Sequence, residues 1–119
     1  MKNLRNKVNL IGRLGMDPKV TELAGGRKVA KFTLATNDIY RNAQGKKVVD
    51  TQWHNIVTWG SSANFAEKYL KKGMEVTLEG RLTYREYEDK KGEKRYITEV
   101  VVDSLLILRG KRQKTAVGA

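Results

Sequence analysis

Two tryptophans lie close together near the middle of the chain, in the stretch TQWHNIVTWG from Thr51 to Gly60. If this stretch is a β-strand, its side chains alternate between faces, so Trp53 and Trp59 share one face and Ile56 lies on the other. Six residues at about 3.3 Å each set the indoles roughly 20 Å apart. That spacing suits an extended ligand, and flat rings can stack on any unpaired base. The alternative is that one or both indoles fill the core.

A second cluster of rings and charges follows in LTYREYEDKKGEKRYITEV, residues 82–100. A glycine turn inside it predicts a hairpin on which cations follow phosphates while rings meet bases; its members are Tyr84, Tyr87, Tyr96, Arg85, Lys90, Lys91, Lys94 and Arg95. The alternative is a solvated hairpin whose own acids balance the charge, namely Glu86, Glu88, Asp89 and Glu93. A weaker cluster of the same kind is IYRNAQGKK, with Tyr40, Arg41, Lys46 and Lys47.

The chain has few of the residue types that catalysis or metal binding requires. His54 is the only histidine and cysteine is absent, so thiolate zinc sites, disulfides and thiol catalysis are excluded. A histidine base needs a nucleophile and an orienting acid, and the sequence positions neither beside His54. We therefore expect no enzyme activity, no metal and no cofactor.

Charge points to an anionic partner. The 119 residues suffice for one domain, and 24 Lys and Arg against 13 Asp and Glu give a net charge of +11. The alternative is a basic protein whose charge serves solubility alone. The first residues, MKNLRNKVNLIGRLG, lack the apolar run of a secretory leader, and no stretch is apolar enough to span a bilayer. We expect a cytoplasmic protein.

Alternation of apolar and polar residues predicts the strands that position these clusters. Strands are expected from Val8 to Leu14, over KVAKFTLAT (residues 28–36), around the tryptophans, and over residues 95–108. In the strand from Met74 to Leu82, the alternate apolar residues face one way and Gly80 predicts a bulge. Turns are expected from Gly15 to Pro18 and at AGGR, residues 24–27.

One helix is expected between the third and fourth strands, in SSANFAEKYLKKG. Ser61 or Ser62 is its expected cap, Gly73 its end, and its apolar stripe consists of Phe65, Ala66, Tyr69 and Leu70. The fold class is therefore all-β, a five-stranded Greek-key barrel of the OB type with one helix after the third strand. We expect this domain to occupy residues 1–108, followed by a short basic tail from 109 to 119.

Several segments together resemble the bacterial single-stranded DNA-binding protein family: NKVNLIGRLGMDPKV, FTLATN, QWHNIV, YLKKGMEVTLEGRL and RYITEVVV. Their order and spacing cover almost the whole domain. The resemblance implies a homotetramer of OB domains that binds single-stranded DNA without strong sequence preference. It implies base stacking at Tyr40, Trp53, Trp59 and Tyr87, and a subunit contact that includes His54, to which we add Val8 and Leu10.

We expect phosphate contacts from basic residues close to these rings and along the same surface. They are Lys7, Arg41, Lys46, Lys47, Lys72, Arg85, Lys91, Lys94 and Arg95. Titration of His54 at a subunit contact would couple assembly to acidity, which sedimentation at pH 5.5 and pH 8 would test.

Partners other than DNA are less well defined by the sequence. Members of the family usually end in a long tail with an acidic tip that recruits replication and repair proteins, whereas this sequence ends in a basic segment. Two other functions stay open. One is an OB-fold interaction module of a replication-restart complex, in which the stacking rings would matter little. The other is an RNA-binding OB protein, which would prefer RNA through 2′-hydroxyl contacts.

Overall fold

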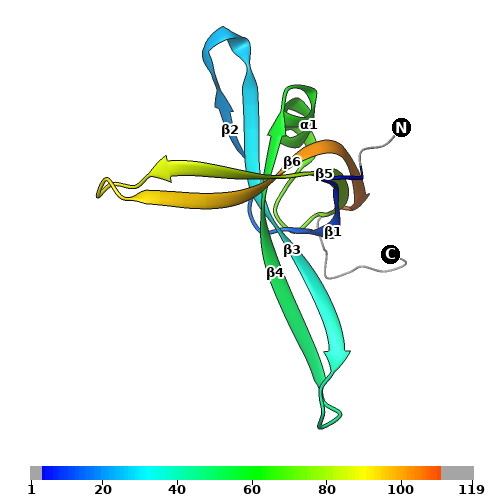
Figure 1. The fold of residues 1–119 in the computed structure, drawn as a ribbon. Coiled ribbons are helices and arrows are strands. Elements are labelled where there is room, and N and C mark those ends of the chain that lie inside the picture. The colour runs from blue at the N-terminus through cyan, green and yellow to red at the C-terminus, as the bar shows by residue number, and fades with distance from the viewer. Residues whose placement is uncertain (1–3, 111–119) are drawn as a thin grey trace.

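The structure is a computed structural model that describes residues 4–110, and these residues form a β-barrel with one helix (Figure 1). The elements in chain order are β1 (Val8–Leu14), β2 (Lys19–Glu22), a short 3-10 turn η1 (Ala24–Gly26), β3 (Lys28–Arg41), β4 (Lys47–Trp59), α1 (Ser61–Tyr69), β5 (Glu75–Glu88) and β6 (Lys94–Arg109). The predicted order of strands with a helix before the last two is confirmed.

The barrel closes because β1 pairs with strands on both of its sides. The sheet order is β1-β5-β6-β4-β3-β2, and β1 also pairs with β3 through Arg13 opposite Ala35 and Leu14 opposite Leu34. The break between β1 and β2 at residues 15–18 divides one long first strand into two halves. The five-stranded OB-type barrel expected from the sequence is therefore the observed fold.

The core lies inside the barrel and is made by alternate residues of the strands. On β3 and β4, Phe32, Leu34 and Ile56 are each at most 2% exposed. The alternation is clear on β3, where Lys31 is exposed and Thr33 is half-buried. Helix α1 covers one end of the barrel with Ala63 and Ala66, both fully buried. The alternation of apolar and polar residues in the sequence thus identifies the side chains that face the inside of the barrel.

The helix differs in detail from its prediction. Gly60 is the N-cap residue, with φ 58° and ψ −124°, and no side chain caps the helix, so the expected cap by Ser61 or Ser62 is wrong. The chain turns so sharply after β4 that Ser61 is already helical. The helix ends at Tyr69 rather than near Gly73. Tyr69 is 49% exposed and packs beside Phe65, so it lies outside the buried stripe.

The bulge predicted at Gly80 is confirmed by a register shift between Glu79 and Gly80 where β5 pairs with β6. A Cβ at Gly80 would lie 2.2 Å from the carbonyl oxygen of Val101, so only glycine fits there. Beyond the bulge, β5 and β6 leave the barrel as a long hairpin, and β3 and β4 form another that points in a different direction (Figure 1). Leu82 is 36% exposed because it lies past this exit, contrary to its expected place on the apolar face.

The domain boundary also shifts slightly. Arg109 is the last residue of β6, so the barrel extends one residue past the expected end at 108. The rest of the expected tail, from 111 to 119, lies outside the described residues. Within residues 4–110, no helix has the length and apolar character needed to cross a membrane.

Candidate nucleic-acid interface

The two tryptophans lie outside the core, on one face of β4. Pairing with β3 sets Trp53 opposite Ala35 and Trp59 opposite Val29, so the two indoles are separated by an even number of residues on one regular strand. Trp53 is 61% exposed and Trp59 is 38% exposed. The core is filled from the other face, where Ile56 is 1% exposed. Both rings are therefore accessible to a ligand.

Trp53 rests against a glycine of the interrupted first strand. A Cβ at Gly15 would lie 2.4 Å from Cζ3 of Trp53 and 2.7 Å from Oγ1 of Thr33, distances that no side chain allows. The backbone of Gly15 therefore lies directly against the six-membered ring of the indole. The sequence identified Gly15 only as a turn residue, because contacts between distant segments leave no local signal.

A groove runs beside Trp59, between the β2–β3 hairpin, called the first hairpin below, and the β5–β6 hairpin. One cleft of about 590 Å³ is lined by Lys19, Thr21, Leu23, Val29, Lys31, Val57, Trp59, Thr83, Tyr84, Arg85, Glu99 and Val101. A second of about 270 Å³ shares Lys19, Lys31, Arg85 and Glu99 with it and also reaches Asn55 and Thr33. Together these two clefts are called the groove below. It brings β2, β3, β4, β5 and β6 to one surface.

Arg85 and Glu99 form an ion pair inside the groove. Nε of Arg85 donates to Oε1 of Glu99 at 3.2 Å and Nη2 donates to Oε2 at 3.0 Å, a two-pronged contact. The side chain of Glu99 is 7% exposed. Hydrogen bonding to Glu99 raises the pKa of Arg85 above its ordinary value. Arg85 was expected to bind phosphate, but its positive charge is paired with the carboxylate of Glu99.

Two lysines of the groove were missed by the sequence analysis. Lys19 on β2 and Lys31 on β3 pair in register across the first hairpin and line both clefts. Among residues 4–110, neither has a carboxylate within 4 Å of its ammonium. Lys31 lies between the core residues Ala30 and Phe32, so the sequence pattern predicts that its side chain faces outward. The pattern does not predict the groove beside it.

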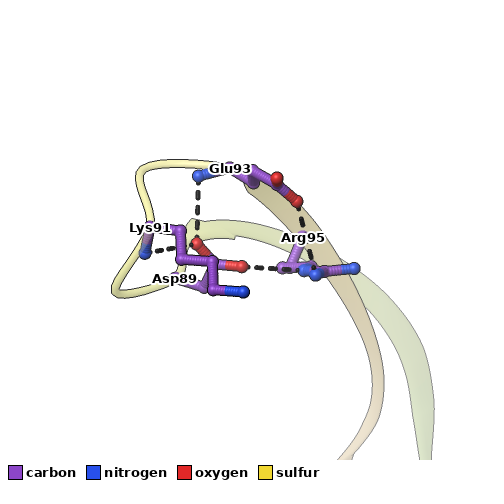
Figure 2. A network of polar contacts seen from close by, with 4 residues as sticks. All are labelled: Asp89, Lys91, Glu93 and Arg95. Carbon is purple, nitrogen blue, oxygen red and sulfur yellow. Dashed lines mark hydrogen bonds and ion pairs between the residues drawn. The ribbon is translucent and has the colours of Figure 1, made fainter.

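The β5–β6 hairpin carries Tyr87, which is 44% exposed and pairs in register with Arg95. Arg95 contacts Asp89 at 2.9 Å and Glu93 at 3.4 Å, and Lys94 contacts Glu86 at 3.6 Å. Figure 2 shows the contacts among Asp89, Lys91, Glu93 and Arg95. The sequence alternative of internal charge balance thus holds for Lys94 and Arg95. The ammonium of Lys91 has no carboxylate partner within the described part of the chain.

The β3–β4 hairpin carries Tyr40, which is 49% exposed. Tyr40 pairs with Val48, whereas Trp53 pairs with Ala35, so the register places the two rings on alternate faces of the ribbon. Arg41 donates from Nη1 to the carbonyl of Gly45 at 2.9 Å. Both lysines of this loop, Lys46 and Lys47, are exposed.

Lys7 and Lys72 lie away from the groove. Nζ of Lys7 contacts Glu79 at 3.4 Å, and the backbone N–H of Lys72 donates to Oδ1 of Asp17 at 2.8 Å. Neither lysine lines either cleft of the groove. Their expected contacts with phosphate stay predictions. The positions of these two lysines outside the groove do not support them.

The residues expected at a subunit contact lie on β1 and β4. Val8 and Leu10 are half-buried and pack against the core of their own chain, and their place at a subunit contact stays a prediction. The outward residue of β1 is Ile11, 59% exposed, which lies beside Leu106, 62% exposed. Nε2 of His54 is 2.9 Å from Oγ1 of Thr36, and the histidine is half-buried. Its place at a subunit contact stays a prediction.

Residues 4–110 contain no group of three or more His, Cys, Asp or Glu side chains that could hold a metal ion. The strongest acid cluster, on the β5–β6 hairpin, is committed to Arg95 and to backbone N–H groups. The groove therefore offers rings, lysines and one buried ion pair, which are groups for binding a polyanion with exposed bases.

Curated relatives and solved structures share this sequence and fold. The chain is 46% identical over 107 residues to single-stranded DNA-binding protein 1 of Chlorobaculum tepidum, which covers 89% of the chain and 66% of that protein. It is 44% identical over 116 residues to the single-stranded DNA-binding protein of Bacteroides thetaiotaomicron, covering 96% of the chain and 72% of that protein. The chain thus spans about two thirds of the length of these relatives.

Among solved structures, the Plasmodium falciparum SSB complex with ssDNA matches with a TM-score of 0.78 and 34% identity, over 91% of this chain and 98% of that one. A deletion mutant of the single-stranded DNA binding protein from Thermus aquaticus matches with a TM-score of 0.76 and 30% identity, over 88% of this chain and 51% of that one. The model of the single-strand binding protein family matches residues 5–108. The chain therefore belongs to the single-strand binding protein family.

Proposed function

We propose that this protein binds single-stranded DNA without strong sequence preference and covers it during replication, recombination or repair. The observation that carries the proposal is the exposure of Trp53 and Trp59 on one face of β4, beside a groove that contains two unpaired lysines. A single strand presents bases that a duplex hides, and every base has a flat face that an indole can cover. The protein acts by binding, without turnover and without a cofactor.

Two kinds of contact divide the work. Stacking on rings contributes about 1 to 3 kcal/mol per base and favours unpaired strands, because a duplex has no free base faces. Cations neutralise phosphates and release counterions, which makes affinity depend on salt. If about six cations meet phosphates, the slope of log K against log salt is near −4. Charge alone would attract a duplex as well, so the rings supply the selectivity.

Intrinsic tryptophan fluorescence tests this function directly. Oligo(dT), oligo(U) of the same length and a DNA duplex are added separately at about 0.15 M salt. Oligo(dT) is expected to quench the indoles at much lower concentration than the duplex does. A preference for oligo(U) would support the RNA-binding alternative instead, and no binding of either strand would contradict the proposal.

Alanine variants locate the site. Trp53→Ala and Trp59→Ala are each expected to weaken oligo(dT) binding by about 5-fold to 150-fold, which corresponds to the loss of one stacked base. Fluorescence anisotropy of labelled oligo(dT) measures this in the double variant, which has no tryptophan. The circular dichroism spectrum serves as the control for folding. Unchanged affinity in the double variant would show that the rings are not the site.

The same proposal includes a homotetramer in the cytoplasm, associated with unpaired DNA of the nucleoid. Support for assembly comes from the family and from the exposed apolar side chains on β1 and β6. The proposal also includes contacts with replication and repair proteins.

A further inference from the structure

A separate cleft lies on the other side of Trp59 from the groove. Its volume is about 630 Å³, and Trp59 lines both this cleft and the groove, so the indole stands between them. The polar side chains around the cleft are Glu22, Arg27, Lys28, Ser61 and Asn64. None of these residues belongs to the expected contacts with DNA. The cleft is called the far cleft below.

Arg27 covers part of Trp59. Its guanidinium carbon is 4.9 Å from the centroid of the indole, within the range of a cation–π contact. A guanidinium can contact a ring with its flat face and leave the N–H groups at its edge available for hydrogen bonds. Within residues 4–110, no carboxylate oxygen lies within 4 Å of Arg27. Its charge is therefore not balanced by a carboxylate.

The other cation of the far cleft, Lys28, is already paired with carboxylates. Nζ of Lys28 contacts Glu67 at 2.6 Å and Glu22 at 3.9 Å. Hydrogen bonding to Glu67 raises the pKa of Lys28 above its ordinary value. This arrangement also ties the carboxylate of Glu22 to an ammonium. Arg27 is thus the cation of the far cleft that can receive an anion.

We propose that the far cleft is a phosphate site for the strand that leaves the groove over Trp59, and that Arg27 binds this phosphate from its place over the indole. The inference rests on the proposed function, because the phosphate belongs to the same DNA strand whose base stacks on Trp59. The planar guanidinium suits both tasks, since its face contacts the ring and its edge can form two parallel hydrogen bonds to a phosphate. An ammonium could supply the charge but not the flat face.

The test compares oligo(dT) binding across a series of salt concentrations for the whole chain and three variants. Arg27→Ala is expected to lower the magnitude of the log-log slope by about 0.7, the value for one phosphate contact on a single strand. Arg27→Lys is expected to keep the slope and lose several-fold in affinity. Arg109→Ala is the matched control, because Arg109 is an exposed arginine paired with Glu75 at 3.5 Å, away from both clefts. Its slope is expected to equal that of the unaltered chain.

Three results would overturn the inference. The first is an unchanged slope in Arg27→Ala, and the second is tighter binding, which would mean that Arg27 only masks the ring. The third is an equal fall in slope for Arg109→Ala, which would mean that net charge explains the effect. If the unaltered chain does not bind oligo(dT) at all, the proposed function fails instead, so the two failures are distinguishable.

A fluorescence readout separates phosphate binding from positioning of the ring. Trp53→Phe retains a stacking ring and leaves Trp59 as the one tryptophan. Oligo(dT) is expected to quench Trp59 fully in this background, with or without Arg27→Ala, and to need a higher concentration when Arg27 is absent. Loss of the quenching together with an unchanged salt slope would assign Arg27 to positioning alone and would contradict the phosphate site.

Discussion

Trp53 depends on a residue far from it in the sequence. Because the six-membered ring of the indole lies so close to Gly15, any side chain at that position pushes the ring from its place. Trp53 is exposed and can move outward, so its displacement disturbs binding more than it disturbs the fold. Gly15 thus acts on the ligand surface through the ring that it supports.

Gly15→Ala is expected to weaken oligo(dT) binding by up to the value of one stacked base, about 1 to 3 kcal/mol. The free energy of unfolding is expected to fall by about 1 kcal/mol, at the low end for overpacking, because the ring has room to move. Fluorescence titration and urea unfolding measure the two effects. Gly110→Ala is the control, since a Cβ there meets nothing within 4 Å. A loss of stability with no loss of binding would show that the ring position is unimportant.

Glu99 holds a cation that the groove would otherwise offer to DNA. Its buried carboxylate binds the guanidinium of Arg85 through two hydrogen bonds. Glu99→Gln removes this negative charge while keeping the side chain's size, so the charge of Arg85 becomes available to a phosphate. The pair therefore limits the electrostatic part of binding.

Glu99→Gln is expected to tighten oligo(dT) binding at low salt and to steepen the salt slope by about 0.7, one further phosphate contact. Salt-dependent fluorescence titration measures both. The matched control is Asp103→Asn, which neutralises an exposed carboxylate 3.6 Å from Arg81. An equal change in the control would mean that net charge, rather than release of Arg85, is responsible. Weaker binding in Glu99→Gln would mean that the ion pair itself shapes the groove.

The two long hairpins end in loops of the same construction. In the β3–β4 loop, Oδ1 of Asn42 accepts hydrogen bonds from the backbone N–H groups of Gln44 and Lys46. In the β5–β6 loop, Oδ1 of Asp89 accepts from Lys91 at 2.9 Å and Glu93 at 3.0 Å (Figure 2). The difference is that Asp89 can be protonated, whereas the amide of Asn42 cannot.

Asp89 makes the β5–β6 loop sensitive to strong acid. Its hydrogen bond with Arg95, and then those with the backbone, hold the pKa of Asp89 below its ordinary value of 3.8. A carboxyl whose folded pKa is lowered stabilises the folded loop fully above the unfolded pKa, and this contribution is lost as the pH falls through the folded value. The loop is therefore intact at neutral pH and in mild acid.

NMR of the backbone amides tests this. As the pH falls below about 4, the amide signals of Lys91 and Glu93 are expected to move together, while those of Gln44 and Lys46 in the other loop stay in place. Asp89→Asn is expected to abolish the transition while leaving the loop closed. Equal movement in both loops would show general unfolding and contradict the assignment to Asp89.

The whole molecule presents an apolar surface away from the groove. Ile11 and Leu106 both pair with Thr77, from the strands on either side of β5, so their exposed side chains are neighbours. Leu108 on the same strand as Leu106 is 45% exposed. None of Ile11, Leu106 and Leu108 lines either cleft of the groove, so a second copy of the chain could cover this surface while DNA remains accessible.

Ile11→Lys is expected to raise the dissociation constant of the oligomer by about 10-fold to 150-fold, because burial of one isoleucine is worth about 1.5 to 3 kcal/mol. Sedimentation velocity over a concentration series measures the assembly. Ile39→Lys is the control, since Ile39 is equally exposed, at 58%, on the β3–β4 hairpin. Unchanged assembly in Ile11→Lys, or an equal effect at Ile39, would place the contact elsewhere.

The sequence by itself determined the strand order, the single helix, the bulge at Gly80 and the shared face of the two tryptophans. These features follow from local alternation and from the backbone requirements of glycine, which neighbouring residues are enough to reveal. The family resemblance also predicted the kind of ligand, which is single-stranded DNA. It did not extend to the cap of the helix, because the turn at Gly60 depends on how β4 meets the barrel.

Only the tertiary structure decided which charges are free. Arg85, Lys94 and Arg95 read as phosphate contacts in the sequence, yet each has a carboxylate partner, while Lys19, Lys31 and Arg27 do not. The same holds for Val8 and Leu10, which pack inward. An ion pair or a packing contact joins residues from different strands, and the distance between them is fixed by the barrel's closure and register, which no local pattern contains.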